Sequence, residues 1–206
     1  TRYGTVTGVQ TCALPIFILK KTEPFGSGKK LLNSKNGLKK ILKMEVVKTL
    51  NELILPSKHH KFLKDDSFER LTWEEVIDNI DRNISENLYP EVKVKKNFGL
   101  VTHDIRDLLK VYPLRKTIQD DRPHLKRLTT HLYISLTSIS ETFGKHNDFM
   151  DVVIWQCLGI TKWIIYDEKV YEYNLKPGEF LYIPMGMFHD TTPVTPRASI
   201  SFGLEA

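Results

Sequence analysis

Alternation between apolar and polar residues dominates the chain from about residue 128 onward. The first stretch of this pattern sets Leu132, Ile134, Leu136 and Ile139 against Tyr133, Ser135 and Thr137. Runs of β-branched and aromatic residues follow at 152–155, 163–166, 170–173 and 180–183. Turn residues separate the runs at 143–144, 158–159, 167–168 and 176–178. A period of two with regular turns predicts an all-β region of the sandwich or jelly-roll type.

The preceding part of the chain shows helical spacing instead. Residues 31–55 place apolar side chains at helical intervals among lysines, which predicts an amphipathic helix. Thr72 and Glu75 form a capping-box pattern, so we expect a helix over residues 73–87. Its apolar stripe consists of Trp73, Val76, Ile77, Ile80 and Ile84. Residues 104–111 predict a short helix that Pro113 ends, and residues 117–126 predict a loop.

These patterns divide the chain into three parts. Residues 6–16 resemble the translation of a sequencing-library adapter, so residues 1–16 are interpreted as an artefact. We expect residues 17–127 to form an N-terminal helical extension and residues 128–206 to form a β-rich core. The expected fold class is mainly β, with the N-terminal helices packed on the β core.

Composition is that of an ordinary globular protein, with 41% hydrophobic residues among 206. The chain has no apolar run of membrane-spanning length and no signal-peptide pattern, so we expect no membrane association. The only cysteines, Cys12 and Cys157, are too few for a disulfide framework. A reducing, cytoplasmic location follows as the expectation.

The net charge of +5 is unevenly distributed. Residues 17–64 contain twelve lysines against three glutamates, which leaves the remainder of the chain acidic. The Lys-rich segment of residues 20–48 offers contacts to nucleic-acid phosphates. Most charge runs are solvated faces, however, so nucleic-acid binding is the less favoured interpretation.

Three residues of the β region have the types and spacing of a metal site. His146 and Asp148 are two residues apart, so their side chains point to the same face if the two residues lie on or at the end of a strand. His189 follows Pro184 and the 180–183 run, a position that a jelly roll can fold back beside the first pair. Two imidazoles and one carboxylate form the facial triad that suits non-haem Fe(II), because three coordination positions stay open.

The surroundings of this triad carry a family resemblance. The segments HNDFMDVVIWQCLGITKW (146–163), YNLKPGEFLYIPMGMFHD (173–190) and ASISFGLE (198–205) resemble, in order and spacing, the Jumonji-C and related cupin-like 2-oxoglutarate oxygenases. The match covers residues 130–206. It implies a double-stranded β-helix, a cupin-like jelly roll, with His146, Asp148 and His189 as iron ligands.

The resemblance also implies the reaction. Fe(II), 2-oxoglutarate and O2 would be used to hydroxylate a protein side chain, a nucleic-acid base or a small molecule, with oxidative decarboxylation of the cosubstrate. Two other interpretations stay open: a metal-dependent cupin enzyme that does not use 2-oxoglutarate, and a non-catalytic cupin-fold binding module.

One position departs from the family pattern. Many members carry Lys or Arg fifteen residues after the first ligand to pair with the distal carboxylate of 2-oxoglutarate, but here that residue is Thr161. Lys162 should point to the opposite face. Arg197-Ala198-Ser199, with Arg197 eight residues after His189, resembles the Arg-x-Ser that serves this role in other branches of the 2-oxoglutarate oxygenases. By this resemblance Arg197 is the expected anchor, with Thr161 and Ser199 donating hydrogen bonds. An exposed Arg on an edge strand is the alternative.

Several further residues are candidates for the pocket or its support. If the face of Tyr133, Ser135 and Thr137 is the inner one, these side chains line the cosubstrate pocket. Gln156 is an expected inner-core residue, and Trp155 and Trp163 are expected to pack in the core. Asp151 and Asp190 are candidates for orienting an imidazole, with simple solvation as the favoured interpretation for Asp190. His59 and His60 are not expected to bind metal, His131 can face the pocket, and His103 and His124 have no partner spacing.

Overall fold

The computed structural model describes residues 52–53, 56–65, 70–85, 92–103, 105 and 110–206, all within one compact unit that spans residues 38–206. The adapter-like residues 1–16, the Lys-rich segment 20–48 and all but residues 52–53 of the predicted 31–55 helix lie outside the described residues. Residues 52–53 are helical.

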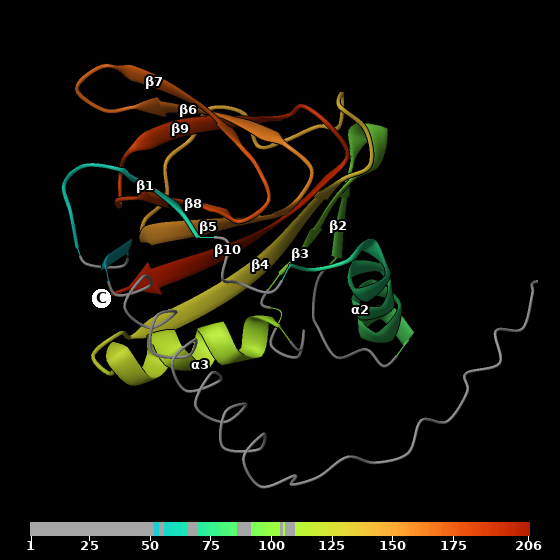
Figure 1. Cartoon of the computed structure of the whole chain (residues 1–206), viewed down its shortest axis with the longest axis horizontal. Coiled ribbons are helices and arrows are strands. Elements are labelled where there is room, and N and C mark those ends of the chain that lie inside the picture. Colours follow the sequence, from blue (N-terminus) through green and yellow to red (C-terminus); the bar gives the residue numbers. More distant parts are fainter. Residues whose placement is uncertain (1–51, 54–55, 66–69, 86–91, 104, 106–109) are drawn as a thin grey trace, which may run out of the picture. The chain divides into compact units, whose positions relative to one another are not determined.

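Two antiparallel sheets face each other and form the predicted double-stranded β-helix (Figure 1). The large sheet has the order β1-β8-β5-β10-β4-β3-β2. Its strands are β1 (Lys61–Lys64), β8 (Glu179–Ile183), β5 (Asp151–Leu158), β10 (Arg197–Glu205), β4 (Arg127–Ser135), β3 (Gly99–Thr102) and β2 (Val92–Lys95). The small sheet has the order β7-β6-β9, with β7 (Val170–Leu175), β6 (Thr161–Tyr166) and β9 (Phe188–Pro193).

Three short strands that precede residue 128 extend the large sheet at both edges. β1 pairs with β8 at one edge, while β2 and β3 extend from β4 at the other, joined by the 3₁₀ turn η1 (Lys96–Phe98). The sequence did not predict these strands, because each has only four residues and carries too little alternation to stand out.

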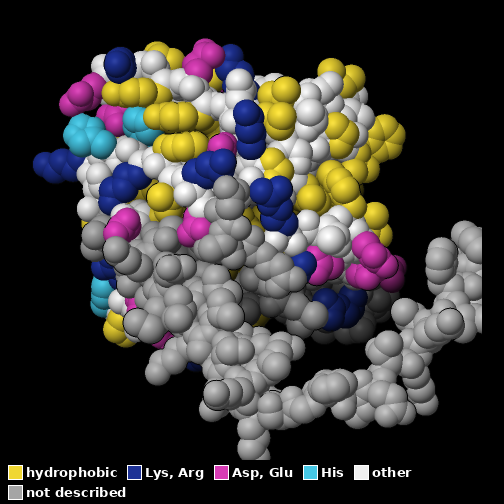
Figure 2. All heavy atoms as spheres, in the orientation of Figure 1, with side chains coloured by type: hydrophobic (Ala, Val, Ile, Leu, Met, Phe, Trp, Pro, Cys, Tyr) yellow, Lys and Arg dark blue, Asp and Glu magenta, His cyan; other side chains and the backbone are white. Residues whose placement is uncertain are grey.

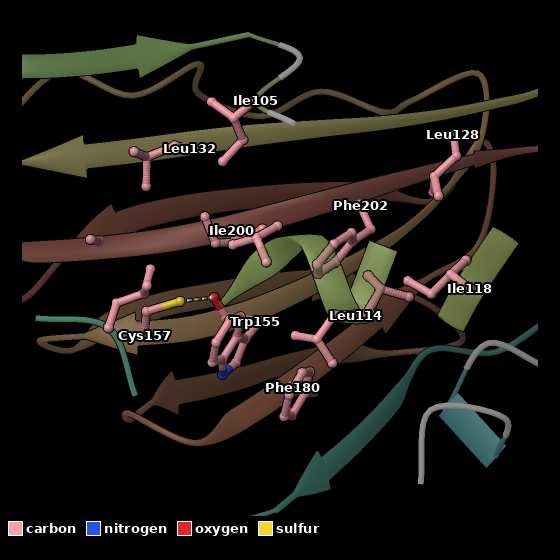
Figure 3. Close-up of a cluster of buried hydrophobic side chains, with 14 of the residues drawn as sticks. Ile105, Leu114, Ile118, Leu128, Leu132, Trp155, Cys157, Phe180, Ile200 and Phe202 are labelled. Atoms are coloured by element: carbon pink, nitrogen blue, oxygen red, sulfur yellow. Dashed lines mark hydrogen bonds between the residues drawn. The ribbon is translucent and has the colours of Figure 1, made fainter. Parts of the chain in front are cut away.

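The central strands of the large sheet are buried on both faces, and β5 shows how the two faces differ. Val153 and Trp155 face a cluster on the outer side of the sheet that includes residues of the helices, whereas Val152 and Ile154 face a cluster between the sheets. Figure 3 shows the outer cluster, where Leu114 and Ile118 of α3 (Val111–Asp121) meet Trp155, Phe180 and Phe202. N-terminal helical structure thus packs on the β core, as predicted.

Helix α2 (Trp73–Ser85) begins at the predicted capping box. The Glu75 side chain accepts from the Thr72 backbone N–H (2.7 Å), and the Glu75 N–H donates to Thr72 Oγ1 (3.2 Å). Val76 of the predicted apolar stripe is buried. Ile77 is 60% exposed, so its assignment to the buried stripe was wrong.

The predicted boundaries around Pro113 were also wrong. Helix α3 runs through Pro113 and includes residues 117–121, which had been assigned to a loop. Pro113 lies in the first turn, where backbone N–H groups have no intrahelical acceptor, so a proline breaks no hydrogen bond there. Residues 104 and 106–109 of the predicted short helix lie outside the described residues.

The alternation at the end of β4 stops earlier than predicted. β4 ends at Ser135, and Leu136 and Ile139 are 47% and 72% exposed. Ser140 Oγ and Thr137 Oγ1 both donate to the carbonyl oxygen of Asn97 (2.7 and 3.1 Å), and these contacts hold the segment as a turn against η1.

Among the described residues, no helix has both the length and the apolar character to cross a bilayer.

Candidate metal centre

The backbone places His146 directly opposite His189. The two residues form an isolated antiparallel bridge in which each N–H donates to the carbonyl of the other, at 2.9 and 2.8 Å. His189 is the second residue of β9, and His146 lies in the loop between β4 and β5. The chain therefore joins two distant segments at the two residues whose imidazoles the sequence had paired.

The turn before β9 brings Asp148 to the same place. Gly186 has a φ of +79°, a left-handed conformation that glycine adopts without strain, and its N–H donates to the Asp148 carbonyl (2.9 Å). Asn147 Nδ2 donates to the Gly186 carbonyl (3.3 Å). These contacts hold the His146–Asp148 segment against the turn that leads into β9.

Both imidazoles are oriented by the backbone just before them. His146 Nδ1 lies 2.8 Å from the Gly144 carbonyl oxygen, and His189 Nδ1 lies 3.1 Å from that of Met187. A carbonyl only accepts, so each Nδ1 carries the proton and donates. Each Nε2 then keeps its lone pair, which is the tautomer that a metal ligand needs.

The three candidate ligand atoms converge. One ligand atom from each of His146, Asp148 and His189 lies within 4.8 Å of the others, and His189 Nε2 is 3.5 Å from Asp148 Oδ2. Ligands at about 2.0–2.2 Å from one ion lie roughly 3–4 Å apart. This is the only metal-type cluster of three or more such residues in the part of the chain that the structure describes.

Burial favours the metal-binding protonation state of His189. The ring is 3% exposed, and this burial is the main reason why its pKa is lowered; the neighbouring His146 lowers it further. A lowered pKa keeps the imidazole neutral at pH 7, and only neutral imidazole binds metal. The donor set, its tautomers and its convergence therefore fit a divalent transition metal.

A narrow cavity of about 50 Å³ adjoins these ligands and contains a buried arginine. Arg197 is 5% exposed, and no carboxylate among the described residues pairs with it. Its Nε donates to Ser135 Oγ (3.2 Å) and its Nη1 to Ser199 Oγ (3.1 Å), while Ser199 Oγ donates to Gln156 Oε1 (2.8 Å). Burial lowers the Arg197 pKa to about 10, so the guanidinium is still charged at pH 7.

The alternation of the strands explains why this cavity is polar. Tyr133 and Ser135 of β4 face it, as does Ser201 of β10 with Arg197, whereas the alternate residues Ile200 and Phe202 face the outer cluster. Burial, with the nearby Asp148, raises the Tyr133 pKa to about 12, so its hydroxyl keeps its proton. Thr191 Oγ1 and Trp163 Nε1 have no hydrogen-bond partner and belong to residues that line the same cavity.

The other predicted cosubstrate residues are placed differently. Thr161 is fully buried, and its Oγ1 has no hydrogen-bond partner. Ser199 Oγ accepts from the Arg197 guanidinium. Neither residue lines the cavity. Lys162 points the other way and pairs with Glu172 (2.8 Å), as expected. Thr137 lies beyond the end of β4 and bonds to Asn97, so the structure does not bring it to the cavity.

Neither candidate aspartate orients an imidazole through a hydrogen bond. Asp151 accepts from the Tyr182 hydroxyl (2.9 Å) and from the Met185 N–H (2.8 Å), which ties β5 to the end of β8. Asp190 accepts from the adjacent Thr191 N–H (2.7 Å). The expected role was wrong because backbone carbonyls already occupy both Nδ1 positions.

The paired histidines 59 and 60 serve a different purpose. Both Nδ1 atoms contact the Asp167 carboxylate, at 3.3 and 2.8 Å, and His60 Nε2 lies 2.7 Å from the Tyr173 hydroxyl. Figure 2 shows histidine side chains beside hydrophobic ones at the upper left of the view, and the His60 ring lies 4.5 Å from the Tyr171 ring, measured between centroids. The contacts fasten the segment before β1 to the β6–β7 turn, and they do not form a metal cluster.

Comparison with known proteins adds a likeness of fold. No family model and no curated protein matches the sequence. The chain is similar to crystal structures of YcfD, a ribosomal oxygenase from Escherichia coli: one has a TM-score of 0.54 at 17% identity, over 72% of this chain and 48% of that chain. A YcfD complex with cobalt and 2-oxoglutarate has a TM-score of 0.51 at 18% identity, with the same shares.

The likeness shows the fold. At such identity it does not carry the activity of YcfD to this chain, which spans about half the length of the YcfD chains. The jelly-roll fold is the one that the family resemblance implied, and it is one of the two types that turns and alternation predicted. The adapter interpretation of residues 6–16 stays a prediction.

Proposed function

We propose that this chain is an Fe(II)- and 2-oxoglutarate-dependent oxygenase that hydroxylates a protein side chain, a nucleic-acid base or a small molecule. The observation that carries the proposal is the coexistence, in one cavity, of the triad and a buried arginine without a carboxylate partner. A buried, unpaired charge is costly, which makes a bound anion the simplest explanation for keeping it. The YcfD complex with cobalt and 2-oxoglutarate supports the proposal as an analogy of fold.

In this proposal His146, Asp148 and His189 would hold Fe(II) on one face, which leaves three positions for the 2-oxo acid and O2. Bound iron would supply the oxidising power, coupled to decarboxylation of the cosubstrate. The chain's own residues supply geometry: the Gly144 and Met187 carbonyls fix both rings, and the sheets exclude water from His189.

Arg197 would bind the distal carboxylate of 2-oxoglutarate. Ser135 Oγ accepts from Arg197 Nε and Ser199 Oγ accepts from Nη1, and these two hydrogen bonds set the direction of the remaining N–H groups of the guanidinium. The Tyr133 hydroxyl, protonated at pH 7, and the unpartnered Thr191 Oγ1 are the nearest further donors that line the cavity. Ser199 then acts through Arg197, which it contacts, whereas Thr161 has an unpartnered Oγ1, does not line the cavity and is given no role in binding.

The size of the cavity sets a condition on binding. A volume of about 50 Å³ is too small for 2-oxoglutarate beside a metal ion unless side chains at the rim shift. Phe143 lines the cavity, is 44% exposed, and has Lys95 Nζ 3.8 Å above its ring. We expect this pair to move outward when the cosubstrate binds.

Release of succinate from 2-oxoglutarate tests the proposal. Purified chain with Fe(II), ascorbate and 2-oxoglutarate should show slow uncoupled turnover, and Arg197→Ala should raise the KM for 2-oxoglutarate more than it lowers kcat. Lys162→Ala is the matched control, because it removes a cation from the opposite face of β6. Metal binding without any 2-oxoglutarate binding would instead favour a cupin enzyme that does not use this cosubstrate.

A further inference from the structure

A second cavity, of about 300 Å³, lies on the other side of Asp148. It shares Tyr133, Asp148, Val152 and Ser201 with the arginine-containing cavity, so Asp148 of the candidate metal centre borders both cavities, whereas His146 and His189 line only the first. Its volume reaches the lower end of the range of small-molecule sites. The proposed oxygenase uses the first cavity for its cosubstrate, which leaves the second for the molecule that is oxidised.

One wall of this second cavity is built by a single face of β4. Arg127, Thr129, His131 and Tyr133 alternate along the strand, and all four line the cavity. His103, just after β3, contacts His131 with 3.2 Å between the two Nδ1 atoms and a T-shaped ring arrangement. One Nδ1 must donate and the other accept, so the two rings hold complementary tautomers.

Of the cavity-lining residues that the structure describes, Arg127 is the one Lys or Arg, and the His103–His131 pair adds two imidazole groups. Asp148 is the one acidic residue among the described residues that line the cavity, and a bound divalent ion would offset its charge. Arg127 is exposed at the start of β4, at the rim. The cavity therefore attracts an anion and repels a cationic side chain such as that of lysine or arginine.

The remaining lining is apolar. Met150 and Val152 are 8% and 6% exposed, and Phe149 lies at the rim. Gly203 makes this arrangement possible, because a Cβ there would overlap Met150 Sδ and Thr129 Oγ1. A bound molecule would therefore contact the apolar side chains of Met150 and Val152 and the hydrogen-bonding groups of Arg127 and the two histidines.

We infer that the second cavity binds the substrate of the proposed oxygenase, and that this substrate is a carboxylate with a short aliphatic part. The carboxylate lies toward Arg127 and the His103–His131 pair, and the aliphatic part lies against Met150 and Val152. The inference rests on the proposed function, because the reacting carbon is identified only by its closeness to Asp148.

Paramagnetic relaxation tests the charge preference with two probes of equal length. The full chain is loaded with Mn(II) and saturated with 2-oxoglutarate, and relaxation of the methyl protons of butyrate and of butylammonium is compared. Butyrate should be relaxed strongly and butylammonium weakly. N-acetyl-aspartyl methylamide is a third probe, which represents an acidic protein side chain. If it binds more tightly than butyrate, the substrate carboxylate belongs to a protein side chain, and if butyrate binds more tightly, it belongs to a free acid.

Single substitutions show which side chain causes the preference for butyrate. Arg127→Ala should weaken butyrate binding about tenfold, the usual cost of losing a charge-assisted hydrogen bond. Lys126→Ala removes the same charge one residue away and should change nothing, because Lys126 contacts the Ala206 carbonyl instead. Equal or stronger relaxation of butylammonium, or an unchanged butyrate affinity in Arg127→Ala, overturns the inference.

The two proposals fail in different ways. Binding of Mn(II) and 2-oxoglutarate is measured on the same samples before the probes are added. Loss of 2-oxoglutarate binding contradicts the proposed function, while dependence of butyrate binding on Arg127 can still be measured with Mn(II) alone. Normal 2-oxoglutarate binding with no preference for butyrate contradicts only the assignment of the second cavity.

Discussion

His146 and His189 are joined by two backbone hydrogen bonds, so their pairing does not depend on their side chains. The fold itself therefore presents the two rings to one point. This predicts that a ligand can be removed while the metal-free protein stays folded.

Replacement of His146 and of His189 by alanine should lower the free energy of unfolding by different amounts. His146→Ala loses one hydrogen bond to the Gly144 carbonyl from a half-buried ring, a change of about 1 kcal/mol. His189 is buried, with its ring centroid 5.8 Å from that of Trp163, so His189→Ala should cost about 2–3 kcal/mol through the space left behind. Urea unfolding of the metal-free variants checks the order, and equal costs would contradict it.

Replacement of Arg197 should separate function from stability. Arg197→Met exchanges a buried charge for an apolar side chain of similar length, so the free energy of unfolding should change by less than about 1 kcal/mol, or rise. Binding of 2-oxoglutarate should be lost in the same variant. Calorimetry with and without 2-oxoglutarate measures both, and a strongly destabilised variant would show that the arginine is structural.

Two glycines with nearly the same backbone angle provide a matched test of packing. Gly144 (φ +67°) has open space where a Cβ would lie, whereas a Cβ on Gly159 (φ +66°) would overlap the Pro196 carbonyl. Gly144→Ala should cost about 1–2 kcal/mol from backbone strain alone. Gly159→Ala should cost about 2–4 kcal/mol, because overpacking is added. Denaturant titration compares them, and the account is wrong if Gly144→Ala is the more damaging.

The Asp167 contacts predict a specific pH dependence. Burial alone would raise the pKa of Asp167, but hydrogen bonds from His60, from the Glu168 N–H and from His59 outweigh it and lower the pKa. A lowered carboxyl pKa contributes stability that is complete above the unfolded value of about 4 and is lost as the pH falls through the folded pKa.

Asp167→Asn removes this titration. The difference in free energy of unfolding between wild type and Asp167→Asn should be largest near neutral pH and should shrink below about pH 4. Urea titrations at a series of pH values measure it. A difference that grows on acidification would mean that the His59 and His60 contacts do not favour the ionised carboxylate.

Local sequence patterns predicted the elements whose signal lies within a few residues. The spacing of His146 and Asp148 marked the ligand pair, although the two residues lie in the β4–β5 loop and not on a strand. Thr72 with Glu75 starts α2 because a capping box needs only four residues. Thr161 lacks a charge, so another cation was needed, and the resemblance of Arg197-Ala198-Ser199 to the Arg-x-Ser of other oxygenase branches pointed to Arg197. The structure places this arginine in the cavity of the triad, although its role in cosubstrate binding stays a proposal.

Features that depend on pairing between distant strands were not predictable. Trp163 and Thr191 line the first cavity because β6 and β9 pair with these residues opposite each other, a register that no local pattern encodes. His103 and His131 meet only because β3 pairs with β4. Helix α3 was missed because Pro113 was interpreted as an end when it lies in the first turn.

Metal stoichiometry tests the central claim most directly. The metal-free chain is titrated with Mn(II) as a spectroscopic substitute for Fe(II), and the free ion is measured by electron paramagnetic resonance. His124→Ala serves as the control, because His124 is exposed and away from the cluster. We predict one tight site per chain in the wild type and the control, with affinity lowered more than about 100-fold in Asp148→Ala. Absence of a tight site in the wild type, or unchanged affinity in Asp148→Ala, would contradict a metal centre formed by His146, Asp148 and His189.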